Sequence, residues 1–449
     1  MQRNYWLPTI LVALALSACN DGNNDYYPIG PRANIQVLHA SPDAPEMAVL
    51  IDDQLAVGEL HYGEGTGEFS VPAGTHTVTI QALNPSGPTT IAGPTTLDFE
   101  QNNDYVIAAE GAVAAISAQV YSHPLSVVAS SSTRVQVVHA APNAAKLAVY
   151  LTAPGADLTT STPFGTAVFM GAIGPTDIPA GQYEIRITAG GQTTPVLFDS
   201  GTITLSGGDD LVLSVLQNTG PGSATVTLGI VDAYGDNSRL YDAATPANLR
   251  VVHDSPDAPP ISVIANGNAA SPLVPSLSYE NFTAYAAVTP GAYTLDITPA
   301  GTPSDVLVSS SLPLNAGDEQ TLYVMGTTAT LGTLVTEDHR RRVATEAKLR
   351  IIQGSPFAGN VDVYLTAPGA GIASASPIYQ AIPFTGDTGF QGFVAGSYDL
   401  TITLAGSMTA AIGPTTIKIA NSGVYTAVVR DAAGGGAPLG LIMLDDFAP

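Results

Sequence analysis

Cysteine is almost missing from this chain of 449 residues, because Cys19 is the only one. A single thiol forms no disulfide bond within the chain, so the small secreted domains that depend on several disulfides are excluded. Zinc sites built from clustered cysteines are excluded as well. We therefore expect the folded domains to be held together by hydrophobic packing alone.

Positive charge is also scarce, with 14 Lys and Arg residues against 38 Asp and Glu residues and a formal net charge of −24. An acidic surface of this kind repels the phosphates of nucleic acids, so we expect no nucleic-acid partner. Charged residues make up only 12% of the chain, whereas hydrophobic residues make up 45%. This balance argues against disorder, which requires low hydrophobicity and high charge.

Tryptophan is limited to Trp6 near the N-terminus. Exposed tryptophan rings are a common platform for sugars in bacterial β-sandwich proteins, so their scarcity lowers the expectation of glycan recognition. Eighteen tyrosines remain and can serve the same purpose. A protein or glycan ligand therefore stays open at this point, and no motif identifies it.

The N-terminus has the pattern of a secretory signal peptide. The apolar run from Tyr5 to Leu16 follows the positive charge of Arg3 and ends in small residues. It is shorter than the roughly 20 residues that a transmembrane helix requires. We therefore expect an exported protein without a membrane-spanning helix in this segment.

The residues that end this segment, Leu16-Ser17-Ala18-Cys19, resemble the lipobox of bacterial lipoproteins. That resemblance implies a signal peptide of residues 1–18, cleavage between Ala18 and Cys19, and acylation of Cys19 with palmitate-type chains. Several acyl chains on one residue form an anchor that does not readily leave a membrane. The membrane is then a partner through the N-terminal lipid.

Residues 19–32 are rich in Asn, Asp and Gly, which is typical of a flexible tether. Asn20 follows the cysteine, and by analogy with the enterobacterial sorting pattern this favours the outer membrane. We therefore expect a lipid-anchored protein of the cell envelope that faces either the periplasm or the outside.

Four copies of one pattern follow, and their first strands begin near residues 34, 134, 249 and 349. The spacing of roughly 100 residues is too long for a solenoid repeat and long enough for each copy to have its own core. The expected domain boundaries lie where the repeated pattern is interrupted. We expect four domains, at 33–128, 133–240, 247–338 and 347–449.

Each copy consists of short alternating apolar and polar runs separated by turns rich in Pro and Gly. One glycine recurs at the same place, as Gly74, Gly181, Gly291 and Gly396, which indicates a backbone angle that other residues tolerate poorly. Strands with one apolar face predict antiparallel β-sandwiches. The connector between the first two domains is short and the other two are longer and charged, so we expect the first two domains to be held more closely together.

The opening His39-Ala40-Ser41-Pro42-Asp43-Ala44-Pro45, together with the strand that starts Pro72-Ala73-Gly74-Thr75, resembles the domain-of-unknown-function family 4397. This family is found in secreted and surface proteins of bacteria, and the resemblance extends from about Ala33 to the end of the chain. It implies an all-β fold, a tandem array of four immunoglobulin-like or transthyretin-like antiparallel β-sandwich domains. The family has no established activity, so it supplies no catalytic residues.

The combination of His39, Ser41 and Asp43 suggests a catalytic triad, but the three residues share one strand and turn. Triads are usually assembled from separate segments that place the base between nucleophile and acid. A histidine that forms hydrogen bonds with its own Ser-Pro-Asp turn explains the pattern, with Gln353 as the neutral substitute in the fourth copy. We expect no catalytic residues and keep five candidates for ligand contact by these loops: His39, Asp43, His139, His253 and Asp257.

Metal and cofactor sites have little support in the sequence. The seven histidines show no zinc spacing, and the acidic turns such as Asp52-Asp53 and Asp445-Asp446 lack a calcium-loop pattern. No glycine-rich nucleotide loop or Gly-x-Ser-x-Gly elbow was found in a suitable context. We expect no cofactor and no metal, with calcium at acidic turns as the open alternative.

The basic island Asp338-His339-Arg340-Arg341-Arg342 stands out in so acidic a chain. With Lys348 and Arg350 it contains five of the 14 basic residues. We interpret it as a solvated connector whose charges pair with nearby acids, each pair contributing under about 1 kcal/mol. Contact with an acidic lipid or polymer is the alternative.

The sequence thus predicts a lipid-anchored envelope protein, not an enzyme, whose repeated β-sandwiches have a spacing, adhesion or binding role. The alternative is an enzyme, or an accessory subunit of one, that processes an envelope polymer. An enzyme is expected to concentrate a polar cluster in one repeat, whereas duplicated binding modules keep matching loops.

Overall fold

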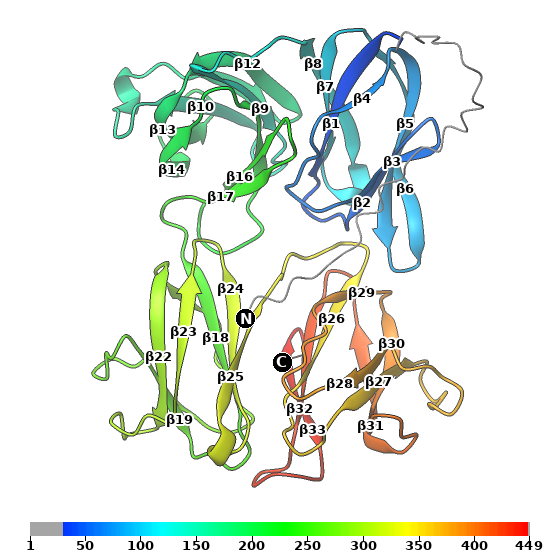
Figure 1. Ribbon diagram of the computed structural model, residues 1–449, viewed down its shortest axis with the longest axis vertical. Coiled ribbons are helices and arrows are strands. Elements are labelled where there is room, and N and C mark those ends of the chain that lie inside the picture. The colour runs from blue at the N-terminus through cyan, green and yellow to red at the C-terminus, as the bar shows by residue number, and fades with distance from the viewer. Residues whose placement is uncertain (1–29, 448–449) are drawn as a thin grey trace, which may run out of the picture.

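The computed structural model describes residues 30–447 (Figure 1). The predicted signal peptide, Cys19 and nearly all of the predicted tether lie outside the described residues. Within residues 30–447, no helix has the length and apolar character needed to cross a membrane. Almost all regular structure in this part of the chain is β-strand, with three short 3₁₀ turns at Val113–Ala115, Leu158–Thr160 and Thr328–Thr330.

The first sandwich consists of two four-stranded sheets, ordered β4-β1-β7-β8 and β3-β2-β5-β6. Its strands are β1 Arg32–Ala40, β2 Met47–Ile51, β3 Gln54–Leu60, β4 Phe69–Pro72, β5 Gly74–Asn84, β6 Gly87–Phe99, β7 Asn103–Glu110 and β8 Ser117–Pro124.

The second sandwich repeats this plan with sheets β12-β9-β15-β16-β17 and β11-β10-β13-β14. Its strands are β9 Ser132–His139, β10 Lys146–Thr152, β11 Gly165–Val168, β12 Gly171–Pro179, β13 Gly181–Ala189, β14 Val196–Leu205, β15 Asp210–Gln217, β16 Val226–Asp232 and β17 Asn237–Leu240. The added strand β17 extends the first of these sheets beyond β16.

The third and fourth sandwiches have the same order, with sheets β21-β18-β24-β25 and β20-β19-β22-β23, then β29-β26-β32-β33 and β28-β27-β30-β31. The third contains β18 Ala247–Asp254, β19 Ile261–Ala265, β20 Val274–Leu277, β21 Ala286–Val288, β22 Gly291–Pro299, β23 Val308–Leu314, β24 Glu319–Met325 and β25 Gly332–Glu337. The fourth contains β26 Ala347–Gln353, β27 Val361–Thr366, β28 Tyr379–Ile382, β29 Gln391–Phe393, β30 Gly396–Leu404, β31 Ala410–Ile419, β32 Val424–Arg430 and β33 Gly440–Asp445.

The predicted class, a tandem array of β-sandwiches, is confirmed. In every sandwich the first strand pairs in parallel with the seventh, as β1 does with β7, and the other pairings are antiparallel. In an immunoglobulin constant domain the first and second strands share a sheet. Here β1 and β2 lie in different sheets, which leaves the transthyretin-like alternative.

The recurring glycine fits its predicted role in three copies only. The φ angles of Gly74, Gly181 and Gly291 are 137°, 157° and 159°, in the range that favours glycine. Gly396 does not have a positive φ angle. A shared residue at a shared position therefore does not guarantee a shared conformation.

Each sandwich has its own core, because successive side chains of a strand point to opposite faces. In β1, Ile35 and Val37 belong to the core between the two sheets of the first sandwich. Equivalent clusters fill the other three sandwiches. The residues of β1 on the opposite face, Leu38 and Ala40, are also apolar and buried.

This second apolar face joins the domains in pairs. Leu38 and Val106 of the first sandwich pack against Val138, Val212 and neighbouring residues of the second. The third and fourth sandwiches form an equivalent cluster around Val252, Tyr323, Ile352 and Val428. The two pairs lie one above the other (Figure 1). Both pairs are thus packed through the same sheets, although the connectors suggested close contact only for the first two domains.

Candidate functional site

The histidines of the repeated loops bond within their own turns. The Nδ1 atom of His39 accepts a hydrogen bond from the backbone N–H of Ser41 at 3.3 Å, and Nε2 donates to the Pro45 carbonyl at 2.9 Å. His253 repeats both bonds, with Ser255 at 3.3 Å and Pro259 at 3.1 Å. Burial lowers the pKa of His39 to about 3, so its ring is neutral at physiological pH.

The other two copies vary this arrangement. In the second, His139 accepts from the N–H of Ala141 at 3.4 Å. In the fourth, the amide of Gln353 accepts from Ser355 N–H at 3.1 Å and donates to the Gly359 carbonyl at 2.6 Å. An amide can replace a neutral imidazole here because both offer one acceptor and one donor.

The carboxylates of the same loops bond to neighbouring backbone. Asp43 accepts from the N–H of Val113 at 2.8 Å, and Asp257 accepts from the N–H of Thr328 at 2.7 Å. The Ser41 hydroxyl has no hydrogen-bond partner among the described residues, so the structure does not join it to His39 as a triad requires. The five loop candidates therefore lie in three separate loops, and ligand contact by them stays a prediction.

The basic island, in contrast, is only in part the solvated connector that we expected, because His339 and Arg342 are exposed but Asp338 is buried. The side chain of Asp338 is fully buried, and its Oδ1 lies 2.6 Å from Nη2 of Arg350, whose side chain is 1% exposed. Asp338 also accepts hydrogen bonds from Thr321 and Tyr285 and lies 3.9 Å from Arg250. The sequence did not indicate this burial, because Arg250 and Arg350 come from the inner strands β18 and β26. The fold places these two strands face to face.

Burial by itself would raise the pKa of Asp338, but Arg350 and Arg250 outweigh it and hold the pKa below its ordinary value. Asp338 is therefore charged over most of the pH range. A carboxylate between two buried guanidinium groups is an internal ion network, in which loss of one partner is far more costly than at a surface.

The three arginines after Asp338 reach three different parts of the molecule. Arg340 pairs with Glu319 of the third sandwich at 3.3 Å, and Arg342 pairs with Asp446 at 2.7 Å. Arg341 donates to the backbone carbonyl of Ala44, in the first sandwich, at 2.6 Å. The connector thus links the two domain pairs directly.

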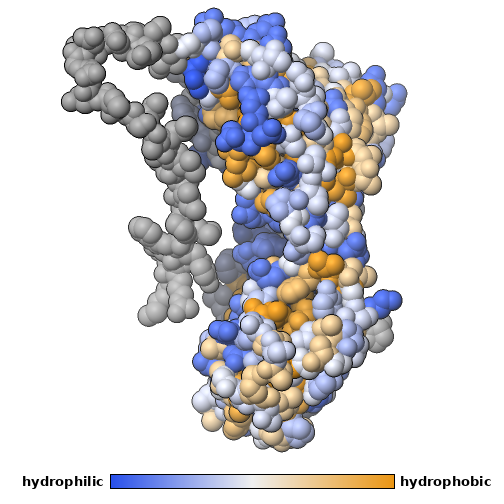
Figure 2. All heavy atoms as spheres, turned by 90° about the vertical axis from the view of Figure 1, so that its right-hand side faces the viewer, coloured by the Kyte–Doolittle hydropathy of each residue, from blue (hydrophilic) through white to orange (hydrophobic). Residues whose placement is uncertain are grey.

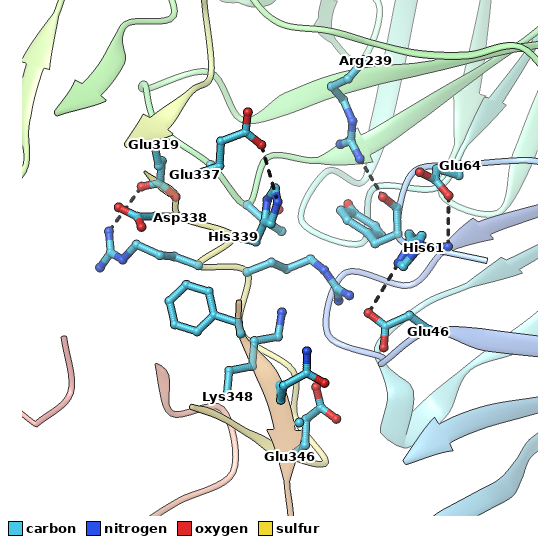
Figure 3. Close-up of a pocket in the computed structure, with 18 of the residues that line it drawn as sticks. Glu46, His61, Glu64, Arg239, Glu319, Glu337, Asp338, His339, Glu346 and Lys348 are labelled. Carbon is cyan, nitrogen blue, oxygen red and sulfur yellow. Dashed lines mark hydrogen bonds and ion pairs between the residues drawn. The ribbon is translucent and has the colours of Figure 1, made fainter. Parts of the chain in front are cut away.

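A cavity of about 840 Å³ lies where the connector meets all four sandwiches. Hydrophilic side chains gather at this level between the two pairs (Figure 2). Glu46 and His61 come from the first sandwich, and Lys348 comes from β26 of the fourth (Figure 3). Arg239 of β17, Arg341 and Glu346 complete the set of charged lining residues on which the argument below depends.

Tyr62 forms a fixed aromatic surface in the wall of this cavity. Its hydroxyl donates to the Gln217 carbonyl of the second sandwich at 2.8 Å, and burial raises its pKa to about 12. The guanidinium carbons of Arg239 and Arg341 lie 5.2 Å and 5.3 Å from the centre of its ring. Both distances are within the range of cation–π attraction.

The charges of the cavity are only partly compensated. The Glu46 carboxylate lies 3.5 Å from Nδ1 of His61, and the hydrogen bond between them lowers the pKa of Glu46 to about 2. Within the described residues, no ion pair joins Arg239, Arg341 or Lys348 to a carboxylate. Burial, and then the neighbouring Arg341, lower the pKa of Lys348.

The sequence contains one usable signal for this site, the concentration of basic residues around 338–350. It did not indicate that Arg239, about 100 positions earlier, or Tyr62 and Glu46 of the first sandwich would lie beside them. These residues meet only because the connector folds back against the first domain pair.

The fold defines a tandem β-sandwich protein built from two docked pairs. Residues 33–150 and 247–364, together more than half of the chain, match the family described as "Domain of unknown function (DUF4397)". The protein belongs to this family. Each match runs from the first sandwich of a pair into the second strand of its partner, β10 or β27, so the family unit extends across the pair interface.

No curated protein matches the chain. Among solved structures, the Bacillus anthracis TIE protein is 12% identical over 92% of this chain and 76% of its own, with a TM-score of 0.16. A putative cell adhesion protein from Bacteroides fragilis is 10% identical over 46% of this chain and 97% of its own, with a TM-score of 0.15. Likenesses at these TM-scores carry no argument about function.

Proposed function

We propose that the protein is a lipid-anchored protein of the bacterial cell envelope whose four sandwiches form one stiff block with a binding or spacing role. The observation that carries this proposal is the packing between domains. Independent modules on flexible connectors would act by avidity, whereas docked modules act as one body. The block offers a fixed geometry to whatever it contacts.

Hydrogen bonds across the interfaces support the stiffness of this block. The hydroxyl of Tyr62 reaches the Gln217 carbonyl across the first pair at 2.8 Å, and that of Tyr279 reaches the Asp431 carbonyl across the second pair at 2.8 Å. Asn237 of β17 exchanges two hydrogen bonds, each of 2.8 Å, with the backbone of Gly65 in the first sandwich. Buried bonds of this kind fix the relative orientation of domains that apolar packing alone would leave less specific.

The stiffness is tested by limited proteolysis of the folded full chain. We expect residues 30–447 to remain as one fragment, because residues 338–346 of the connector are held by ion pairs and backbone hydrogen bonds to three sandwiches. Release of separate sandwiches or pairs under native conditions would contradict the stiff block.

The anchorage is tested by labelling cells with radioactive palmitate. We expect the full chain to carry the label and to sediment with membranes, and the Cys19→Ala variant to lose both properties. Ser17→Ala is the matched control, since it keeps a small residue before the cleavage site. A labelled, membrane-bound Cys19→Ala protein would contradict lipid attachment at this residue.

The two roles are separated by protease treatment of intact and lysed cells with a tag at the C-terminus. Loss of the tag from intact cells supports binding at the outer surface. Protection until lysis supports a periplasmic spacing role.

A further inference from the structure

Three cations at the cavity between the domain pairs lack a carboxylate partner. In a chain with 38 acidic and 14 basic residues, a lysine or arginine can easily be paired, yet Arg239, Arg341 and Lys348 are not in ion pairs within the described residues. The side chain of Lys348 is half-buried and makes no hydrogen bond to a described residue either. A charge that is withdrawn from water without a partner costs stability, so this arrangement needs a reason.

The two guanidinium groups are already held in place. Arg341 donates to the carbonyls of Ala44 at 2.6 Å and Pro42 at 3.3 Å. Arg239 donates to the Tyr62 carbonyl at 2.9 Å and the Thr227 hydroxyl at 3.0 Å. Donors that are oriented before a ligand arrives lose little conformational freedom on binding.

The unpaired cations also repel one another. After the larger effect of burial, Arg341 lowers the pKa of Lys348, and Glu46 and Glu346 offset part of this shift. Burial also lowers the pKa of Arg341, where Glu46 opposes the shift and Arg239 adds a small further lowering. An anion placed among the three groups would relieve both repulsions and supply the missing partner of Lys348. The site is therefore suited to a negative charge.

The surrounding carboxylates restrict which anion fits. Glu46 and Glu346 line the same cavity, and Glu346 is 5% exposed and makes no ion pair within residues 30–447. Both negative charges of a phosphate would be repelled by these carboxylates. A ligand with a single negative charge would be repelled less. Glu46 and Glu346 would instead accept hydrogen bonds from hydroxyl or amino groups elsewhere on the ligand.

We propose that this cavity binds a small organic carboxylate that also carries hydroxyl or amino donors. Lys348, Arg341 and Arg239 face the carboxylate, and Glu46 and Glu346 accept from the donor groups. A volume of about 840 Å³ lies in the usual range for small-molecule sites. Acidic sugars and free amino acids share this chemistry. The proposal rests on the binding part of the proposed function and does not depend on lipid anchorage.

The test is isothermal titration of the purified full chain, in detergent, with millimolar glucuronate and, separately, glutamine. Glucose and inorganic phosphate are the comparison probes. We expect one of the first two to bind, which also distinguishes an acidic sugar from an amino acid. We expect glucose and phosphate to bind at least about tenfold more weakly, because each lacks one half of the required chemistry.

Lys348→Met is the decisive variant. We expect it to weaken binding by about tenfold or more and to leave the thermal midpoint unchanged or higher, because an unpaired, partly buried charge is removed. Lys418→Met changes an exposed lysine of β31 and is expected to bind like the native chain.

Three outcomes would each overturn the proposal: neither carboxylate binds, phosphate binds more tightly than both, or Lys348→Met binds as the native chain does. The thermal midpoint separates loss of binding from loss of folding. Failure here would leave the palmitate labelling of Cys19 and the proteolysis result unaffected, so it is distinguishable from failure of the proposed function.

Discussion

The outer face of the first strand carries Gln36 and Gln136 in the first domain pair, and Arg250 and Arg350 at the matching positions in the second. Gln36 is satisfied by neutral carbonyls, since its Nε2 donates to Thr66 and Asp232 at 2.9 Å each. Arg350 and Arg250 require carboxylates, which Asp338 and Asp445 provide at 2.6 Å and 2.8 Å. One docking geometry therefore accepts either a neutral or an ionic centre.

The ion-paired centre of the second domain pair has a structural consequence that the neutral centre of the first pair lacks. Asp338 belongs to the connector, so the second pair is complete only when the connector lies in its folded position. The same segment then places Arg341 against the first sandwich and forms part of the cavity wall. A change from amide to arginine in one pair thus couples that pair to the assembly of the whole block.

Buried carboxyl groups also distinguish the two pairs. In the first pair, Glu110 ends β7 on the interface face and is fully buried, with its Oε1 accepting from the Tyr121 hydroxyl at 2.9 Å. In the second pair, Asp254 occupies the position of Ala40 and lies against Gly354, where a larger residue would collide with it. Burial raises the pKa of both carboxyl groups, whereas the pKa of Asp338 is lowered. The second pair therefore combines carboxyl groups of opposite pH dependence.

The largest expected effect is the pH dependence of the first pair. Burial raises the pKa of Glu110 from 4.5 to about 8, so its stabilising contribution is complete below pH 4.5 and is lost as the pH rises through 8. The quantity to compare is the free energy of opening of the first domain pair, in the native chain minus that in the Glu110→Gln variant. We expect this difference to fall by about 3–6 kcal/mol between pH 4.5 and pH 8. Hydrogen exchange of β7 and β15, corrected for intrinsic rates, measures it.

Glu100→Gln serves as the control for this titration, because Glu100 is exposed. A difference between native chain and Glu110→Gln that is constant from pH 4.5 to 8 would show that Glu110 does not titrate in the folded interface.

The next effect breaks the ionic centre of the second pair. Asp338→Ala leaves Arg350 and Arg250 buried without their shared partner, which we expect to cost about 3–5 kcal/mol. Hydrogen exchange should accelerate in β18 and β26 and stay nearly unchanged in β1 and β9. Asp305→Ala, at an exposed acid of the third sandwich, should change neither. Equal acceleration in both pairs would mean that Asp338 does not distinguish them.

The smallest of the three effects tests the apolar part of the first interface. Leu38 is 2% exposed and packs in the cluster between the first two sandwiches, so Leu38→Ala should cost about 2–4 kcal/mol there. Exchange in β1 and β9 reports the loss, and β26 should be unaffected. Leu55→Ala is the matched control in the same sandwich, since Leu55 is 67% exposed and its loss should matter little. An effect no larger than that of the control would argue against a packed interface.

Much of the fold could be predicted from local patterns. Strand alternation and Pro/Gly turns indicated sandwiches in every copy, and the loop bonds of His39 and Gln353 involve residues at most six positions away. Such interactions depend on short stretches of chain, and four copies of the pattern repeat the same information. The apolar Leu38 and Ala40 on the outer face of β1 also signalled that this face is covered, but not by what.

The candidate site could not be predicted in the same way. Asp338 and Arg350 are close in sequence, so a solvated connector with weak local ion pairs was the natural interpretation of this segment. Their burial depends on the opposing Arg250 and on the docking of the third and fourth sandwiches. Arg341 meets Ala44 across almost 300 residues, a contact that no local pattern specifies.

The sequence by itself determined the number of repeats, the β-sandwich class, the acidic character of the chain and the family to which it belongs, because these follow from composition, periodicity and recurrence. The tertiary structure decided that the sandwiches dock in pairs, that Asp338 of the connector is buried beside Arg350 and Arg250, and that three unpaired cations line one cavity. The physical reason is that charge compensation and burial depend on distances between residues remote in sequence, and only the folded chain sets those distances.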